Sequence, residues 1–149
     1  MLGTTLIAAG EEIGWRGLLI HELSKITNFT WASLLSGGLW AVYHFPAMIF
    51  ADYHGAGSLW YSMLCFTIMI RSFSVIITWF RLKAGSVWTP VFLHTAHNVF
   101  VQTIFTPLTY DSGPTEYLID GFGAGLAAVD LIAAVVIWRL RDRATEGKS

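Results

Sequence analysis

The chain has 149 residues, of which 54% are hydrophobic and only 13% are charged, and its mean hydropathy is +0.56. A water-soluble domain carries about 25% charged residues, so this composition excludes an ordinary soluble domain and indicates a membrane protein. A net charge of −1 without a basic patch excludes nucleic acid as an expected partner. The single cysteine excludes an intramolecular disulfide and a thiolate metal cluster. The length indicates one domain, residues 1–149.

Five apolar stretches approach the length of about 20 residues that a bilayer-spanning helix needs. They cover roughly residues 2–23, 29–51, 58–80, 86–106 and 118–139. We therefore expect an all-α fold, a polytopic transmembrane bundle of about five membrane helices. The connectors are short except for residues 107–117, whose Pro, Gly, Asp and Ser residues predict an exposed loop.

The charges in the connectors are distributed unevenly between the two expected sides of the membrane. One side carries the basic residues Lys25, Arg81, Lys83, Arg139, Arg141, Arg143 and Lys148. The other side carries the acidic residues Asp52, Asp111, Glu116 and Asp120. Because positive charges remain on the cytoplasmic side, we expect a multi-pass plasma-membrane protein with a cytoplasmic C-terminus and residue 1 outside.

The first apolar stretch contains three charged residues, Glu11, Glu12 and Arg16. Each costs about 2.5–3.5 kcal/mol at mid-membrane, so charges kept there usually have a function. Glu12 and Arg16 are four residues apart and meet on one helix face, whereas Glu11 lies about 100° away and remains free for chemistry. The alternative is a buried ion-pair network that only fixes helix packing.

Two further polar groups interrupt the second and fourth stretches. The second contains Trp40 and His44, and the fourth contains His94, His97 and Asn98. His94 and Asn98 share a helix face, and His97 lies about 60° from His94 on the same side. At 1.5 Å per residue, Glu11, His44, His94 and Asn98 lie between about 13 and 22 Å from the cytoplasmic ends of their helices. Side chains at such similar depths can form one site.

This set of side chains supports the addition of water to a carbonyl. A carboxylate in an apolar pocket is a better base because its charged form is disfavoured there. One histidine can share the proton transfer, and a second histidine with an asparagine amide can donate hydrogen bonds to the developing oxyanion. A lone intramembrane histidine is more often hydrogen-bonded across helices, so the argument depends on the joint pattern.

The same residues could instead bind a metal. Glu11, His44 and His94 would form a reasonable nitrogen and oxygen ligand set for zinc. The His-Glu-x-x-His signature is absent and no local spacing demands a metal, so we expect no cofactor and keep zinc as the alternative. Arg71 and Asp130 both lie about 15 Å deep. We expect them to form a structural pair, with a catalytic role as the alternative.

Three motifs resemble those of the CAAX prenyl endopeptidase and bacteriocin-processing (CPBP, or Abi) family of intramembrane proteases. The likeness covers roughly residues 8–104, and the motifs read Glu11-Glu12-x-x-x-Arg16, Trp40-x-x-x-His44 and His94-x-x-x-Asn98. The flanking segments Gly14-Trp15-Arg16-Gly17 and His44-Phe45-Pro46 are also similar.

The resemblance implies endoproteolysis of a membrane-associated peptide or a lipidated protein without a metal, in a protein of the prokaryotic branch. It implies that Glu11 and His44 activate water, that His94 and Asn98 stabilise the oxyanion, and that Glu12 and Arg16 support the site. Family members usually carry further membrane helices before the double glutamate. We therefore expect this chain to be a fragment, a minimal core or a product of an internal start.

Two other functions remain open from the residues alone. The first is a bacteriocin-immunity or peptide-binding membrane protein that sequesters a peptide without turnover. The second is a proton-coupled transporter in which the Glu and His side chains relay protons. A transporter is the less favoured of the two, because no internal inverted repeat is visible.

Overall fold

The computed structural model describes residues 2–55, 57–110 and 112–144, except for the side chains of residues 116, 143 and 144. These ranges are helical and contain no strand, which confirms the all-α expectation. Five long helical segments, or rods, account for most of the described residues. The helices are α1 (Leu2–Glu12), η1 (Ile13–Leu19), α2 (Ile20–Ile26), α3 (Phe29–Phe50), α4 (Leu59–Ala84), α5 (Trp88–Asn98), η2 (Val99–Phe105), α6 (Thr106–Leu108), η3 (Pro114–Tyr117), α7 (Ala124–Arg139) and η4 (Arg141–Ala144). The first rod joins α1, η1 and α2, and the fourth joins α5, η2 and α6.

Local chemistry fixes where the long helices begin and end. The side chain of Asn28 accepts a hydrogen bond from the Trp31 N–H at 3.0 Å at the start of α3. The Ser58 hydroxyl accepts one from the Tyr61 N–H at 3.3 Å at the start of α4. Such caps satisfy backbone donors that have no partner within the helix. Helix α4 ends at Gly85, whose φ of 68° is left-handed and therefore suits glycine.

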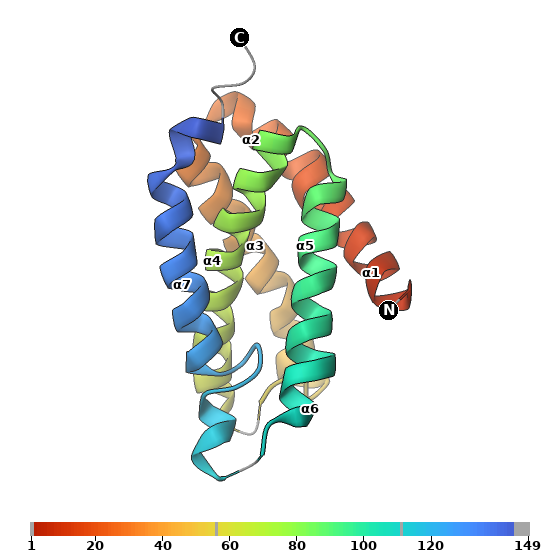
Figure 1. Cartoon of the computed structure of the whole chain (residues 1–149), viewed down its shortest axis with the longest axis vertical. Helices are drawn as coiled ribbons and strands as arrows, with labels where there is room; N and C mark the ends of the chain where they lie inside the picture. The colour runs from red at the N-terminus through yellow and green to blue at the C-terminus, as the bar shows by residue number, and fades with distance from the viewer. Residues whose placement is uncertain (1, 56, 111, 145–149) are drawn as a thin grey trace.

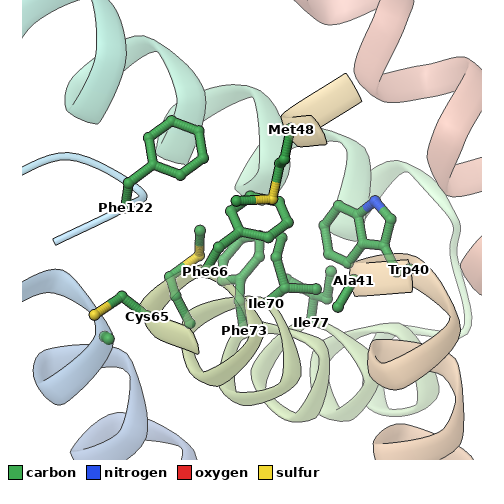
Figure 2. Packing of buried hydrophobic residues seen from close by; sticks show 11 residues of the cluster. Trp40, Ala41, Met48, Cys65, Phe66, Ile70, Phe73, Ile77 and Phe122 are labelled. Carbon is green, nitrogen blue, oxygen red and sulfur yellow. The ribbon is translucent and has the colours of Figure 1, made fainter. Parts of the chain in front are cut away.

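Helix α4 is the centre of the bundle (Figure 1) and packs against α3, α5 and α7, while α1 packs against α5. The apolar core lies along α4, and Figure 2 shows Phe66 and Phe73 of α4 beside Trp40 and Met48 of α3 and Phe122 of the loop before α7. Large apolar side chains on the outer faces of the helices remain exposed, as expected of surfaces in contact with lipid.

Two helices of the described residues, α3 and α4, are long and apolar enough to cross a membrane as single helices. The first and fourth predicted spans are instead interrupted by the π-helical segments η1 and η2. The last helix starts at Ala124 instead of near residue 118, because the chain turns at Asp120 (φ 69°) and the Gly125 N–H bonds the Leu118 carbonyl at 3.0 Å. This turn directs Phe122 into the core.

The structure places the charged connectors at two ends of the bundle (Figure 1). The ends of α2, α4 and α7 carry Lys25, Arg81, Lys83, Arg139 and Arg141, whereas the opposite end carries Asp52 and Asp120. Asp111 and Lys148 lie outside the described residues, as do the side chains of Glu116 and Arg143. The cytoplasmic location of the basic end remains a prediction.

Candidate active site

A cavity of about 290 Å³ opens between α1, α3, α4 and α5. The four residues predicted to be catalytic all line it: Glu11, His44, His94 and Asn98. Aromatic side chains form much of the remaining wall: Trp40, Tyr53, Phe66, Phe73 and Phe122. Residues distant in sequence therefore meet in one partly enclosed space, which is lined by both polar and aromatic side chains.

The predicted Glu12–Arg16 pair is present and fully buried. Arg16 Nη1 donates to Glu12 Oε1 at 3.0 Å, and both side chains are 0% exposed. The pair places two opposite charges in the helix interior, where neither would be stable alone.

Glu12 has a second partner that the spacing of the motifs did not indicate. His94 Nδ1 lies 2.9 Å from the same Oε1 atom of Glu12. A carboxylate accepts hydrogen bonds, so Nδ1 carries the proton and Nε2 is the ring nitrogen left for other contacts. Glu12 thus joins the first motif directly to the third.

Trp40, the aromatic residue of the second motif, contacts residues of the first and third motifs. Its Nε1–H donates to Glu11 Oε2 at 2.8 Å. The Arg16 guanidinium lies 4.2 Å from the centroid of its ring, and the His94 ring meets it edge-on at 5.0 Å. Because Glu11 forms no salt bridge with any described residue, this N–H is the contact that holds its carboxylate.

His44 is held by the backbone of the preceding turn. Its Nδ1 lies 2.9 Å from the Trp40 carbonyl oxygen, so Nδ1 donates and Nε2 is an acceptor in the neutral ring. The ring is half-buried and lies against Tyr53 and Phe66, at centroid distances of 6.2 and 5.2 Å. This arrangement fixes the orientation of the His44 ring and leaves its Nε2 atom able to accept a hydrogen bond.

A π-helical segment follows the two glutamates of the first motif, and another follows Asn98 of the third. Segment η1 begins one residue after Glu12, and η2 begins one residue after Asn98. Such widened turns occur frequently at functional sites. The Asn98 side chain makes no hydrogen bond to any other described residue, so its amide is free to donate.

The expected Arg71–Asp130 pair is wrong. Asp130 is buried on α7, and His97 Nε2 lies 3.5 Å from its Oδ2 atom. Arg71 is exposed in a groove of about 500 Å³ between α3, α4 and α7, and it forms no salt bridge with the described residues. The two residues lie on neighbouring helices, but α4 directs Arg71 to the outer surface while Asp130 faces inward.

The candidate zinc ligands do not fit a metal site in this arrangement. Within the described ranges, no three His, Cys, Asp or Glu side chains form a group able to hold a metal ion. Glu11 is hydrogen-bonded to Trp40, and His94 Nδ1 is hydrogen-bonded to Glu12. The expectation of a site without a metal, with zinc as the alternative, stays a prediction to be tested.

The cavity residues that the sequence argument did not single out include Tyr53, Gln102 and Phe122. Tyr53 and Phe122 lie in connectors, where neither helical periodicity nor a motif marks them. Burial and the nearby charge of Asp120 raise the pKa of Tyr53, so its phenol stays protonated at neutral pH. Gln102 stands in an apolar helix, and its polarity was the one available signal.

Comparison with known proteins adds an independent observation. The family model described as type II CAAX prenyl endopeptidase, Rce1-like, matches residues 1–100. CAAX prenyl protease 2 of Methanococcus maripaludis is 35% identical over 82 residues, which cover 52% of this chain and 30% of that protein. The uncharacterized protein YyaK of Bacillus subtilis is 29% identical over 101 residues, which cover 66% of this chain and 30% of that protein. No solved structure matches the chain.

The chain thus spans about 30% of the length of the curated relatives that it matches. The family model nevertheless covers all three motifs, including the double glutamate on α1 and the His94 and Asn98 pair on α5. The chain belongs to the family of type II CAAX prenyl endopeptidases, the Rce1-like proteins.

Proposed function

We propose that this chain is an intramembrane endopeptidase that hydrolyses a peptide bond of a membrane-associated peptide or a lipidated protein. The observation that carries the proposal is the shared cavity, in which Glu11, His44, His94 and Asn98 meet although they come from three different rods. At about 290 Å³ the cavity is comparable to small-molecule sites. That volume admits a scissile bond with its flanking side chains but excludes a folded domain.

Glu11 and His44 are proposed to activate the attacking water. Glu11 lies on the wall of the cavity, where the Trp40 Nε1–H holds its Oε2 atom at 2.8 Å. Its carboxylate keeps further lone pairs with which it can accept a proton from water. The His44 tautomer leaves Nε2 unprotonated, so this atom can accept a proton or orient the water.

His94 and Asn98 are proposed to stabilise the oxyanion. The Asn98 amide has two N–H donors and no partner in the described residues. His94 donates through Nδ1 to Glu12, so it can also donate through Nε2 when the ring carries both protons. Arg16 holds Glu12 in place, and Glu12 in turn holds the His94 ring.

Substrate is proposed to reach Glu11 from the bilayer. Besides the inner cavity, Glu11 lines an outer groove of about 520 Å³ between the first rod and α3. Gly10 and Gly14 form part of this groove, and a side chain added at either position would meet nothing within 4 Å. Glu11 therefore lies where an extended peptide in the groove would bring its backbone to the cavity.

The proposed setting is a prokaryotic plasma membrane that the chain crosses several times, with its C-terminus in the cytoplasm. The basic end of the bundle supports this orientation. No metal cofactor is part of the proposal.

The test is cleavage by purified protein in detergent, followed with a library of internally quenched peptides. The library includes one peptide that ends in a prenylated cysteine and three further residues. We expect the wild type to cleave a subset, and Glu11→Gln to reduce that cleavage by about 10²–10⁴-fold, the usual contribution of a general base. Glu22→Gln is the matched control, because Glu22 is an exposed acid paired with Lys25 on α2.

Two outcomes would contradict the proposal. Undiminished cleavage by Glu11→Gln would remove Glu11 from the role of base. Binding of peptides by the wild type without any cleavage would instead indicate a peptide-binding membrane protein.

A further inference from the structure

His97 lies on the α5 face that carries His94 and Asn98, and its imidazole lines the same cavity. It is half-buried, with a side chain 15% exposed, and the Phe73 ring lies against it at a centroid distance of 4.5 Å. Neither Nδ1 nor Nε2 forms a hydrogen bond to a described residue. A second histidine of α5 therefore lies in the cavity with its proton-carrying atoms uncommitted.

The carboxylate of Asp130, which does not line the cavity, lies beside this ring. Its Oδ2 atom is 3.5 Å from His97 Nε2, and both atoms are buried without another partner. Helix α7 contributes no other side chain to this arrangement and none to the cavity wall. Asp130 thus reaches the cavity only through His97.

The burial of Asp130 needs a physical reason. A charged carboxylate among apolar helices is unfavourable unless it has a partner. Arg71 of the neighbouring helix α4 faces the outer groove and forms no salt bridge with the described residues. An imidazolium at His97 is the partner that the geometry offers.

We infer that His97 is a catalytic acid, which protonates the amine that leaves when the peptide bond breaks, and that Asp130 is its positioning residue. This inference rests on the proposed endopeptidase function. It adds a group that the three motifs do not supply, since Glu11 and His44 receive protons while His94 and Asn98 donate hydrogen bonds to oxygen.

Hydrolysis of the peptide bond then proceeds in two stages, addition of water and departure of the amine. The oxygen of water forms a C–O bond to the carbonyl carbon, and the carbonyl oxygen becomes an oxyanion. The water gives one of its protons to Glu11. The C–N bond then breaks, its electron pair passes to nitrogen, and the nitrogen takes a proton from the Nδ1 atom of the His97 imidazolium. The products are a carboxylic acid and a neutral amine, with Glu11 protonated and His97 neutral. Return of the Glu11 proton to His97 through cavity water restores the resting enzyme.

An amine leaving group needs a proton donor, whereas a thiolate leaving group does not, and this difference provides the test. A thiol has a pKa of about 8.5, so a thiolate departs without a proton donor, whereas an amide nitrogen does not. We therefore compare a quenched peptide that the wild type cleaves with a thioester that has the same acyl half. Rates are measured for purified wild type, His97→Gln, Asp130→Asn and the double variant, and the residual rate of Glu11→Gln is subtracted from each.

For His97→Gln we expect kcat on the peptide to fall by about 10²-fold or more, as for loss of a general acid, with KM little changed. The thioester rate should stay within a few-fold of the wild type. Asp130→Asn should show the same selectivity with a smaller loss, and the double variant should match His97→Gln alone, because Asp130 acts through His97.

The chain supplies a matched control pair outside the cavity. His54 Nε2 lies 2.9 Å from Asp52 Oδ1 in the connector after α3, and His54 is absent from the cavity wall. His54→Gln and Asp52→Asn should leave both rates unchanged.

Equal losses on peptide and thioester, or additive losses in the double variant, would overturn the inference and leave His97 and Asp130 a structural role. Unchanged peptide cleavage by His97→Gln would also overturn it. With any of these results, wild-type cleavage that depends on Glu11 would leave the proposed function intact. A wild type that cleaves neither the peptide nor the thioester would refute both the proposed function and this inference.

Discussion

His94 Nδ1 and Arg16 Nη1 both bond the same carboxylate oxygen of Glu12, at 2.9 and 3.0 Å. The second glutamate of the first motif therefore does more than balance an arginine on its own helix. It fixes which nitrogen of His94 carries the proton and turns the other nitrogen toward the cavity. The buried charge and the proposed oxyanion donor are parts of one network.

Replacement of Glu12 should destabilise the protein much more than replacement of Glu11. Glu12→Gln leaves Arg16 buried without a counter-charge, which costs about 3–5 kcal/mol. Glu11→Gln removes no salt-bridge partner, because Glu11 has none among the described residues. Thermal unfolding of the two variants in detergent checks this, and equal melting temperatures would refute the assigned network.

Trp40→Phe should slow catalysis while the bundle stays folded. The substitution removes the N–H that holds Glu11 but keeps an aromatic ring beside Arg16 and His94. Loss of a hydrogen bond to a charged group is worth about 1.5–3 kcal/mol, so the rate of peptide cleavage should fall by about tenfold or more. Trp31→Phe, an exposed position on the same helix, is the control and should be neutral. A wild-type rate in Trp40→Phe would show that Glu11 needs no such support.

The contact between α3 and α4 should tolerate no side chain at Gly37. A Cβ atom there would lie 2.9 Å from Arg71 Cα and 2.8 Å from Ser74 Cβ. Gly37→Ala should therefore cost about 1–3 kcal/mol through overpacking. Gly38→Ala is the matched comparison, because nothing lies within 4 Å of a Cβ at that position. Equal unfolding temperatures for the two variants would mean that the helices do not approach so closely.

Removal of metal ions should leave peptide cleavage unchanged. The mechanism proposed above needs proton transfer and hydrogen-bond donors but no Lewis acid. Purified protein is dialysed against a chelator and assayed, and its zinc content is measured by mass spectrometry. Stoichiometric zinc in the wild type that disappears in His44→Ala would overturn the metal-free mechanism and support the ligand set Glu11, His44 and His94.

The orientation in the membrane can be tested with single cysteines. Cys65 is the sole native cysteine, so a Cys65→Ser background carries no competing thiol. Ser112→Cys in the loop before α7 should react with an impermeant maleimide in intact cells, whereas Lys83→Cys at the basic end should react only after the cells are opened. The reverse pattern would invert the topology.

Much of the fold follows from the residues alone. Runs of apolar residues near bilayer length predicted the helices because a buried backbone must satisfy its own hydrogen bonds. The Glu12–Arg16 pair followed from the four-residue helical repeat, a purely local relationship. The last helix was placed too early because the turn at Asp120 depends on contacts that the pattern of apolar residues does not encode.

Relationships between helices required the tertiary structure. The sequence indicated that Glu11, His44, His94 and Asn98 lie at similar depths, but depth does not specify which way a helix is rotated or which helices are neighbours. Packing around α4 decided that His94 bonds Glu12 and that Asp130 faces His97, away from Arg71. Asp130 and His97 are 33 residues apart in the chain, and His94 and Glu12 are 82 residues apart. No local periodicity determines pairings over such separations.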